Sequence, residues 1–583
     1  MNLVIKIQFL LYFIFSQTNA HIDESVHNFN FNDVSLDTPT LDDLGKLFLK
    51  LMSDFGQSHR DSKSCLDCNK TLTYLREHVK SGQQIRDLAE STCKTATSPR
   101  VCRGNINIKA DPMVYIIKNS KLTVQESCSA MMHPDCMTHL KAPVTKWVNW
   151  ELPLPKPKPF TPKTVGTKQL KMLHLTDAHL DLWYTPGSNS RCNEPVCCRS
   201  TSPGHNHSAG YWSETSYSCD TPLSFAETAL EHMSVAHRDI DFVIWTGDNI
   251  PHDTWNTTEA VNLKHVKYMT DLVKKAFPGK LVFPSLGNHE PHPPFMFVPH
   301  EVEVKTNGSF SMSWLYDTLA DSYWSQWIST PAAKQTFKKG GYFAAPLNAD
   351  IKLIVLNNAI CWRPNYWIAY DPYDPDGQLQ WLINELDSAE SDGKYAIIIG
   401  HIPFNECYPA WTNNYFRIME RYQQIVVGNY VGHTHTDEIL VMLNKNTRTN
   451  ETYPVGHAYL GSSMTTFSGL FPGYRVFTLE NTGKPIDFLM YYSNVTEDNL
   501  MGKDVTPKWT AGYSAKQSYN LKSLSTEDWN NFIIRAKTDD SLTKTYYERY
   551  YRFSDAFLAN HKHTIQDMRN ILQNKRVVNP LYL

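Results

Sequence analysis

The stretch IVVGNYVGHTH, residues 425–435, joins an apolar, β-branched run to a glycine and two histidines. The run predicts a buried strand, because β-branched residues favour strands and no polar face alternates with the apolar one. In an extended segment residues i and i+2 point the same way, so the rings of His433 and His435 can reach one object. The pair therefore predicts a polar site at the end of a buried strand.

Five further apolar runs have the same form. They are LKMLHLTD (170–177), FVIWTGD (242–248), LVFPSLGN (281–288), IKLIVLNN (351–358) and YAIIIGH (395–401). Amphipathic stretches among them predict helices at 225–237, 258–276, 313–328 and 378–388. Buried strands interleaved with helices predict an α/β fold in which helices cover a sheet.

Polar side chains stand where these strands end. They are Asp177, His179, Asp248, Asn288, His289, His401, His433 and His435. In open α/β sheets, ligand sites form beyond the carboxyl ends of the strands. Carboxylate, imidazole and amide oxygen together suit Zn²⁺, with Mn²⁺ or Fe²⁺ as less favoured alternatives. One ion needs three or four ligands, so this set predicts two ions that share one carboxylate.

Other functional classes receive no support. The net charge of −3 and the pI near 6.8 give no signature of nucleic-acid binding. The chain has no P-loop, no dinucleotide-binding glycine pattern and no G-x-S-x-G motif. A lone buried histidine is more often a hydrogen-bonding residue than a ligand, and we interpret His174, His457 and the tail histidines in that way.

The N-terminus predicts export. Residues 1–20 contain one lysine, then an apolar run, then small residues at Thr18 and Ala20, a pattern typical of a signal peptide. The alternative interpretation is a buried helix. No later segment has 18 uninterrupted apolar residues, so we expect a soluble mature protein. Twelve cysteines fit an oxidising compartment. Six sequons predict glycan sites at Asn69, Asn206, Asn256, Asn307, Asn450 and Asn494. The expected location is secreted, lysosomal lumen, or both.

Composition divides the rest of the chain. Residues 61–140 carry six cysteines and a helical stripe of Leu72, Leu75 and Val79, which predicts a small disulfide-stapled helical domain. Residues 147–166 are rich in proline and predict an extended linker. A catalytic domain is expected at 167–490, and a helical C-terminal region at 491–583.

The strand-end motifs D-x-H, G-D, G-N-H-E, G-H and G-H-x-H, in that order, resemble the calcineurin-like metallophosphoesterases over residues 168–480. The resemblance implies a β-sandwich flanked by helices that holds two metal ions. It implies that one ion is bound by Asp177, His179 and His435, the other by Asn288, His401 and His433, and that Asp248 bridges both. It also implies proton donors, for which we rank His289 first and His252 second.

The cysteine spacing of the small domain, C-x2-C, C-x8-C and C-x7-C, resembles the saposin domain; a generic disulfide-rich pro-region is the alternative. A saposin-like domain and a proline linker before the catalytic domain are similar to the acid sphingomyelinase family. The resemblance implies six disulfides: Cys65–Cys136, Cys68–Cys128, Cys93–Cys102, Cys192–Cys197, Cys198–Cys219 and Cys361–Cys407.

The implied function is zinc-dependent hydrolysis of sphingomyelin to ceramide and phosphocholine, with the saposin-like domain presenting membrane lipid. We expect a monomer with peripheral membrane contact, without nucleic acid as a partner. Two alternatives stay open: a phosphodiesterase for nucleotides or other soluble diesters, and a lipid-transfer protein with a structural metal site.

Overall fold

The computed structural model describes residues 62–580 except 96–97, 133–134, 142–149, 163–164, 206, 216–217 and 561–562. The predicted signal peptide and the predicted glycan site Asn206 lie outside the described residues. None of the described helices is both long and apolar enough to cross a membrane.

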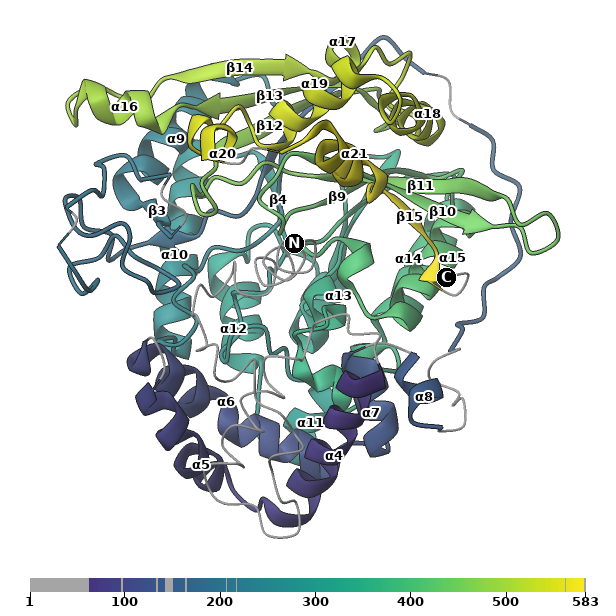
Figure 1. Cartoon of the computed structure of the whole chain (residues 1–583). Coiled ribbons are helices and arrows are strands. Elements are labelled where there is room, and N and C mark those ends of the chain that lie inside the picture. The colour runs from purple at the N-terminus through teal and green to yellow at the C-terminus, as the bar shows by residue number, and fades with distance from the viewer. Residues whose placement is uncertain are drawn as a thin grey trace.

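Two sheets form the centre of the catalytic domain (Figure 1). The first has the strand order β14 (Trp509–Ser514), β13 (Pro485–Ser493), β12 (Gly473–Leu479), β1 (Leu170–Leu175), β4 (Phe242–Trp245) and β5 (Leu281–Pro284). The second has the order β15 (Arg576–Val578), β10 (Glu438–Lys445), β11 (Thr452–Leu460), β9 (Val426–Val431), β8 (Tyr395–Ile399), β7 (Ile351–Val355) and β6 (Phe343–Pro346). A short pair, β2 (Leu180–Asp181) and β3 (Thr221–Pro222), lies apart from both.

All six strands predicted from the apolar runs are present, and they pair in parallel, three in each sheet. Strands β1, β4 and β5 run parallel in the first sheet, and β7, β8 and β9 in the second. Strands β4 and β8 are buried at every position, which explains their continuous apolar sequence. The sheets pack on each other through aromatic rings, such as Tyr430 on Phe477 with ring centroids 5.1 Å apart. The predicted α/β sandwich is confirmed.

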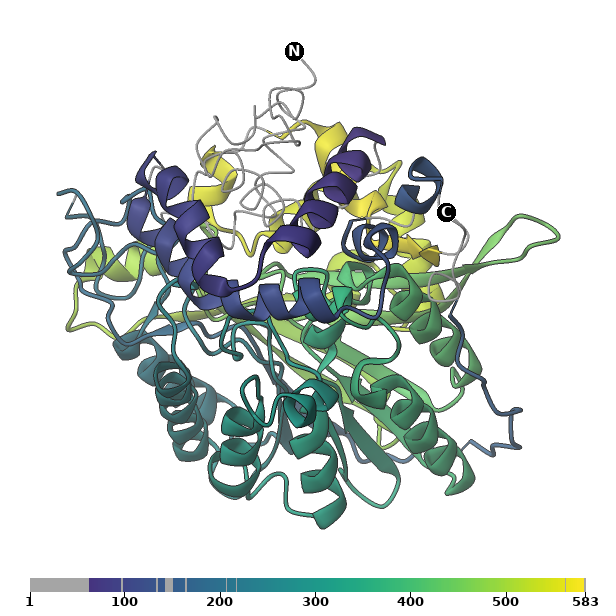
Figure 2. The ribbon, with the colours of Figure 1, turned by 90° about the horizontal axis from the view of Figure 1, so that it is seen from below.

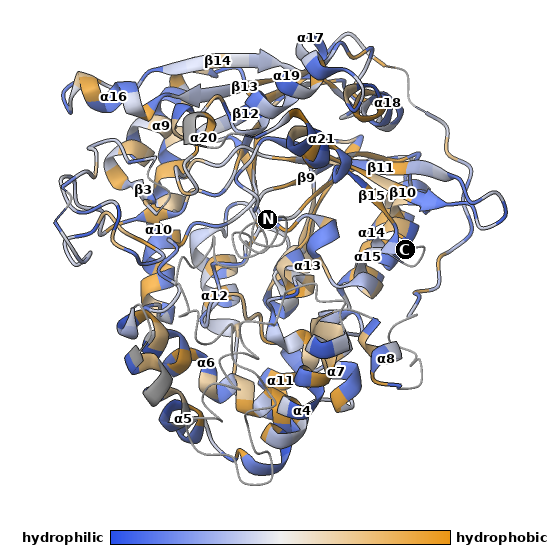
Figure 3. Cartoon of the chain, in the orientation of Figure 1, coloured by the Kyte–Doolittle hydropathy of each residue, from blue (hydrophilic) through white to orange (hydrophobic). Residues whose placement is uncertain are grey.

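Helices cover the sheets. They are α9 (Leu223–Ala236), α10 (Glu259–Ala276), α11 (His300–Lys305), α12 (Ser313–Thr318), α13 (Pro331–Gly340), α14 (Gln378–Ser391) and α15 (Pro409–Arg421). Figure 3 shows hydrophobic residues along central strands such as β9, whereas the flanking helices mix hydrophobic and hydrophilic positions. This pattern is that of helices with one buried face.

The helix predicted at 313–328 is wrong in its second half. The α-helix ends at Thr318, and a single π-helical segment, Leu319–Tyr323, follows it. Trp324 then turns into the core, where it is fully buried against Trp245 with ring centroids 5.7 Å apart. The apolar residues after Thr318 therefore serve core packing, which periodicity alone cannot distinguish from a continued helix.

The small domain consists of helices α4 (Ser62–His78), α5 (Gly82–Thr95), α6 (Pro99–Asn119), α7 (Val124–Met131) and α8 (Asp135–His139). Figure 2, seen from below, shows these purple and blue helices nearest the viewer, in front of the sheets. Three disulfides hold the domain: Cys65–Cys136, Cys68–Cys128 and Cys93–Cys102. These pairs are the ones that the saposin resemblance implies.

Helix α6 docks the small domain on the catalytic domain along its whole length. At its start, Arg100 Nε donates to Glu194 Oε1 at 2.6 Å. In its middle, Lys109 is buried against the rings of Phe295 and Tyr366. After its end, Lys121 Nζ lies 2.6 Å from both Asp371 Oδ2 and Glu301 Oε1. The two domains therefore share an extensive interface.

The proline-rich linker runs extended over the catalytic domain, as predicted for this composition. The Leu152 N–H donates to Asn414 Oδ1 at 2.7 Å, and Arg421 Nε donates to the Pro155 carbonyl at 2.7 Å. Phe160 packs edge-on against Tyr395 of β8, with centroids 5.3 Å apart. The linker is thus fixed along its described length by side chains of the catalytic domain.

The C-terminal region contains α16 (Val495–Met501), α17 (Ala515–Tyr519), α18 (Thr526–Ala536), α19 (Asp540–Tyr550), α20 (Asp555–Asn560) and α21 (Ile565–Gln573). It is not only helical, because β14 extends the first sheet and β15 pairs with β10 in the second. The sequence did not predict these two strands. They connect the region to both halves of the sandwich.

Candidate metal centre

Loops that follow the central strands bring the predicted ligands together. Asp177 and His179 follow β1, Asp248 follows β4, and His433 and His435 follow β9. All five residues have φ between 39° and 77°, a left-handed conformation that is uncommon outside glycine and is often found at functional sites. Next to them, a Cβ at Gly432 would overlap Thr176 Oγ1 and Asp177 Oδ2. The backbone therefore requires glycine beside the histidine pair.

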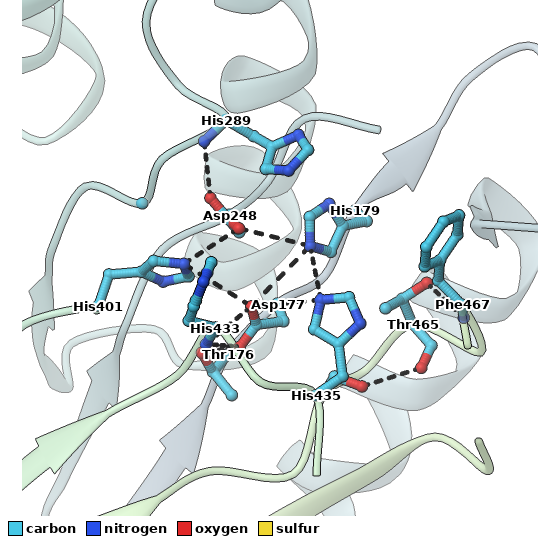
Figure 4. Close-up of polar contacts among 12 residues, drawn as sticks. Thr176, Asp177, His179, Asp248, His289, His401, His433, His435, Thr465 and Phe467 are labelled. Atoms are coloured by element: carbon cyan, nitrogen blue, oxygen red, sulfur yellow. Dashed lines mark hydrogen bonds and ion pairs between the residues drawn. The ribbon is translucent and has the colours of Figure 1, made fainter. Parts of the chain in front are cut away.

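Two carboxylates lie at the middle of the cluster, surrounded by imidazoles (Figure 4). Asp248 Oδ2 lies 3.0 Å from His401 Nε2 and 3.5 Å from His179 Nε2. Asp177 Oδ1 lies 3.6 Å from His435 Nε2. All of these residues are buried, so the charges are shielded from water.

Backbone carbonyls determine which ring nitrogen faces the carboxylates. His179 Nδ1 contacts the Ile250 carbonyl at 2.7 Å, and His401 Nδ1 contacts the Thr246 carbonyl at 2.6 Å. A carbonyl only accepts hydrogen bonds, so each Nδ1 carries a proton and each Nε2 is turned toward the carboxylates. Burial lowers the pKa of each ring, but Asp177 and Asp248 outweigh it and raise the pKa of His179 and of His401 to about 9. Carbonyl-oriented imidazoles of this kind are typical of metal ligands.

The inward-facing atoms lack protein partners of the right kind. Asp248 Oδ2 and His401 Nε2 make no hydrogen bond to any described residue. His179 Nε2 and His435 Nε2 face each other at 3.1 Å, a contact between two nitrogens that a shared cation would relieve. Burial raises the pKa of Asp177, but His401 and His179 outweigh it and lower that pKa to about 2. An ionised carboxylate and ring nitrogens that face inward form a donor set that fits divalent cations.

A second group of ligand atoms lies on the other side of Asp248. The ligand atoms of Asp248, His401 and His433 lie within 4.8 Å of one another. His433 Nε2 contacts Glu406 Oε2 at 3.2 Å, whereas its Nδ1 has no hydrogen-bond partner among the described residues. Asn288 is fully buried in the loop after β5, one residue before His289. The arrangement is compatible with Asp248 facing two cations.

The two predicted proton donors lie within the cluster: a ring nitrogen of His252 lies within 4.8 Å of those of His179 and His435, and one of His289 within 4.8 Å of the ligand atoms of His179 and Asp248. The backbone N–H of His289 donates to Asp248 Oδ1 at 2.9 Å, and its ring packs against that of His179 with centroids 4.8 Å apart. His252 is stacked between His179 and Phe467, with centroids 3.9 and 3.7 Å away. Burial lowers the pKa of both rings well below the ordinary value.

Three acidic residues that the sequence analysis did not assign orient side chains and loops of the site. Asp220 Oδ1 contacts His252 Nδ1 at 2.8 Å and so orients that ring. Glu290 accepts hydrogen bonds from the backbone N–H groups of Gly287, Asp248 and Asn249, which joins two ligand loops. Glu406 Oε2 contacts His433 Nε2 at 3.2 Å and so orients that ring. Only Glu290 had a local signal, as the last residue of the G-N-H-E motif.

The remaining predicted residues are not among the proposed ligands. His174 Nε2 contacts Thr246 Oγ1 at 2.9 Å and His457 Nδ1 contacts Thr526 Oγ1 at 2.8 Å, as expected for hydrogen-bonding histidines. The catalytic domain contains the disulfides Cys192–Cys197, Cys198–Cys219 and Cys361–Cys407. Among the sequons, Asn256, Asn307 and Asn450 are exposed, and Asn69 and Asn494 are partly buried.

Comparisons with known proteins agree with this geometry. Residues 170–437, which include every predicted metal ligand, match the family described as calcineurin-like phosphoesterase. A Bos taurus protein named sphingomyelin phosphodiesterase is 36% identical over 78% of this chain and 72% of its own length. The Homo sapiens protein of that name is 34% identical over 84% of this chain and 78% of its own. Sphingomyelin phosphodiesterase 2 of Caenorhabditis elegans is 32% identical over 84% of this chain and 83% of its own length.

Proposed function

Because the chain belongs to the sphingomyelin phosphodiesterase family of calcineurin-like phosphoesterases, we propose that it hydrolyses sphingomyelin to ceramide and phosphocholine at a centre of two zinc ions. The family predicted from the strand-end motifs is thereby confirmed. The observation that carries the proposal is the position of Asp248 Oδ2 between His401 and His179, whose Nε2 atoms are turned inward by backbone carbonyls.

The proposed ligands divide into two sets that share Asp248. The first consists of Asp177, His179 and His435, and the second of Asn288, His401 and His433. When bound, two divalent ions activate a water molecule and neutralise charge on a phosphodiester undergoing in-line displacement. Nitrogen and oxygen donors of this kind favour Zn²⁺, and Mn²⁺ or Fe²⁺ are the less favoured alternatives.

His289 and His252 are the proposed proton donors for the departing ceramide alkoxide. Both rings lie within the buried cluster and neither belongs to the proposed ligand sets. His252 Nδ1 faces Asp220, and its Nε2 has no hydrogen-bond partner among the described residues, so Nε2 is the atom available to exchange a proton. His289 ranks first because its neighbour Asn288 is a proposed ligand, and because its backbone N–H donates to Asp248 Oδ1 at 2.9 Å, which places the residue beside the proposed bridging carboxylate.

The proposed substrate lies in a membrane, and the proposed enzyme is a monomer that contacts it peripherally. The small helical domain would present lipid to the centre, since α6 passes from its disulfide-stapled core to the aromatic residues beside His289. The proposed location is the lysosomal lumen, the secreted fraction, or both, on the basis of the signal-peptide pattern and the sequons.

The test is a liposome assay with headgroup-labelled sphingomyelin across pH 4–8, paired with metal analysis of the same preparation. Release of labelled phosphocholine, lost on chelation and restored by zinc, is the expected result. Binding to liposomes without release would favour a lipid-transfer protein. Hydrolysis of soluble diesters without hydrolysis of liposomal sphingomyelin would favour a nucleotide-type phosphodiesterase.

A further inference from the structure

The last part of the chain contacts the segment that carries the histidine pair. We call residues 540–580 the C-terminal tail. The Asp437 N–H donates to the carbonyl of Tyr550 at 3.0 Å, and Glu438 forms a buried ion pair with Lys575. The Val441 N–H also donates to the Lys575 carbonyl at 2.8 Å. Asp437 and Glu438 follow His435 by two and three residues, so the tail holds the chain where it leaves the metal centre.

The tail also reaches a second loop of the centre, residues 461–466. In this loop the Thr465 N–H donates to the Asp177 carbonyl at 3.0 Å, and the Met464 N–H donates to the Thr176 carbonyl at 3.1 Å. Arg552 Nη1 donates to both the carbonyl and the hydroxyl oxygen of Ser463, at 2.9 and 2.8 Å. The loop that holds the backbone of Asp177 is therefore itself held by a tail residue.

Arg552 is an unusual residue for this task. Its side chain is fully buried, and Nε and Nη2 make no hydrogen bond to a described residue. It also has a φ of 52°, which is unfavourable for a residue with a side chain. Burial lowers the pKa of the guanidinium to about 9, although Asp437 and Asp177 oppose this. A buried and partly unsatisfied cation destabilises the fold, so stability alone does not explain it.

We propose that Arg552 is a positioning residue of the metal centre, which holds the 461–466 loop and through it the left-handed backbone at Asp177. The inference rests on the proposed function, because it assumes that Asp177 binds a metal ion. It assigns the tail an indirect part in catalysis: Tyr550 and Lys575 hold the segment after His435, and Arg552 holds the loop that contacts the backbone of Asp177. Removing Arg552 should therefore loosen the metal site while leaving the fold intact.

Loss of Arg552 leaves no buried polar group of Ser463 without a hydrogen bond. The Ser463 carbonyl keeps a second hydrogen bond from the Gly473 N–H at 2.8 Å, and the Ser463 hydroxyl keeps its donation to the Thr465 carbonyl at 3.0 Å. A methionine of similar length therefore leaves no acceptor of Ser463 unpaired. Replacing a partly unsatisfied buried charge by an apolar side chain is often neutral or stabilising.

The experiment compares Arg552→Met and Arg552→Lys with the control Arg569→Met in the full-length protein. Arg569 lies on the same tail and pairs with the exposed Asp540. Three measurements are made: Tm after metal removal, the rate of zinc loss to a chelator, and steady-state kinetics on a soluble phosphodiester, which give kcat and KM. We expect Arg552→Met to keep or raise the metal-free Tm, to lose zinc about tenfold faster and to lower kcat about tenfold with little change in KM.

Arg552→Lys should recover part of both effects, because an ammonium can still donate to Ser463, and Arg569→Met should match the wild type. A metal-free Tm that falls while zinc loss and kcat stay unchanged would make Arg552 a purely structural residue and overturn the inference. Wild-type values for all three measurements in Arg552→Met would overturn it too. Wild-type protein that neither binds zinc nor cleaves a diester would instead overturn the proposed function, and this inference with it.

Discussion

The imidazoles of the metal centre differ in the atom that fixes each ring. Backbone carbonyls hold His179 and His401, whereas carboxylates hold His252 and His433. A carbonyl enforces one tautomer, while a carboxylate also stabilises the protonated ring. The carbonyl contacts leave Nε2 of the first pair facing the cluster, and the contact with Asp220 orients His252, whose Nε2 has no hydrogen-bond partner among the described residues.

At the residue scale, His289→Ala is expected to lower kcat by about 10²- to 10⁴-fold, the range for loss of a general acid. Zinc content should not change, because the Asp248 contact uses the backbone N–H, which alanine retains. Steady-state kinetics and metal analysis of the purified variant measure both. His300→Ala, in an exposed part of α11, is the control. Unchanged kcat would remove the assignment, and loss of zinc would make His289 a ligand.

Acid stability can also be traced to single residues. His265 is fully buried on α10, with Nδ1 2.8 Å from the Val261 carbonyl, and burial lowers its pKa to about 4. The unfolded chain then binds a proton more strongly than the folded chain, so this histidine contributes stability above its unfolded pKa. That contribution is lost as pH falls from about 6.5 to about 4.

His265→Met should therefore flatten the pH dependence of stability. Between pH 7 and pH 5 the loss of unfolding free energy should be smaller than in the wild type by about 2 kcal/mol. Thermal unfolding of both proteins at the two pH values measures it through the difference in Tm. An identical difference for the two proteins would show that His265 titrates normally in the folded chain.

At the element scale, two loops tied by a disulfide support His433. Cys361–Cys407 joins the segment after β7 to the segment after β8, and Trp362 pairs with Cys407 through a β-bridge. Trp362 Nε1 donates to Glu406 Oε2 at 3.2 Å, and the indole packs against the His433 ring with centroids 4.8 Å apart. The indole of Trp362 and the carboxylate of Glu406 thus hold the imidazole of His433, a proposed ligand.

Glu406→Gln should weaken the hold on His433 while preserving the shape of the side chain. We expect zinc affinity to fall about 10- to 100-fold, the usual cost of losing a residue that orients a ligand. Competition with a chelator of known affinity measures the change. Glu385→Gln on α14, which removes a carboxylate paired with Lys352 of β7, is the control and should bind zinc normally. Normal zinc affinity in Glu406→Gln would mean that Trp362 and the disulfide suffice to hold His433.

At the scale of the whole molecule, the small domain and the catalytic domain meet along α6, and Lys121 lies at one end of that interface. Its ammonium contacts Asp371 and Glu301 of the catalytic domain, and its backbone N–H donates to the Tyr370 carbonyl at 2.9 Å. This contact couples the domain proposed to bind lipid to the domain that cleaves it.

Lys121→Glu should separate these two activities. Reversing the charge places three carboxylates together and opposes docking of the small domain. We expect hydrolysis of liposomal sphingomyelin to fall about tenfold, whereas kcat on a soluble diester stays near the wild-type value. Lys118→Glu is the control, because Lys118 Nζ donates to the backbone carbonyl of Arg76 within the small domain. Equal loss on both substrates would mean that the small domain only supports the catalytic fold.

The sequence by itself determined the strands and the ligands that end them. Each of the six runs is a local signal: its apolar residues predict a buried strand, and the Asp, Asn or His that follows lies at the sheet edge because parallel strands end together. The order of these motifs was sufficient to identify the family. Local sequence failed where the core overrode periodicity: the helix predicted at 313–328 ends as an α-helix at Thr318, and Trp324 is buried against Trp245 instead of continuing it.

Only the tertiary structure decided how those ligands are held. Asp220 meets His252, Glu406 meets His433 and Arg552 meets Ser463 across 32, 27 and 89 residues of sequence. Such contacts leave no periodic or spacing signal, because they depend on how separate loops pack rather than on the conformation of any one of them. The GHTH segment shows both limits: the sequence indicates that its two histidines face one site, and the folded tail and loops determine which atoms they present.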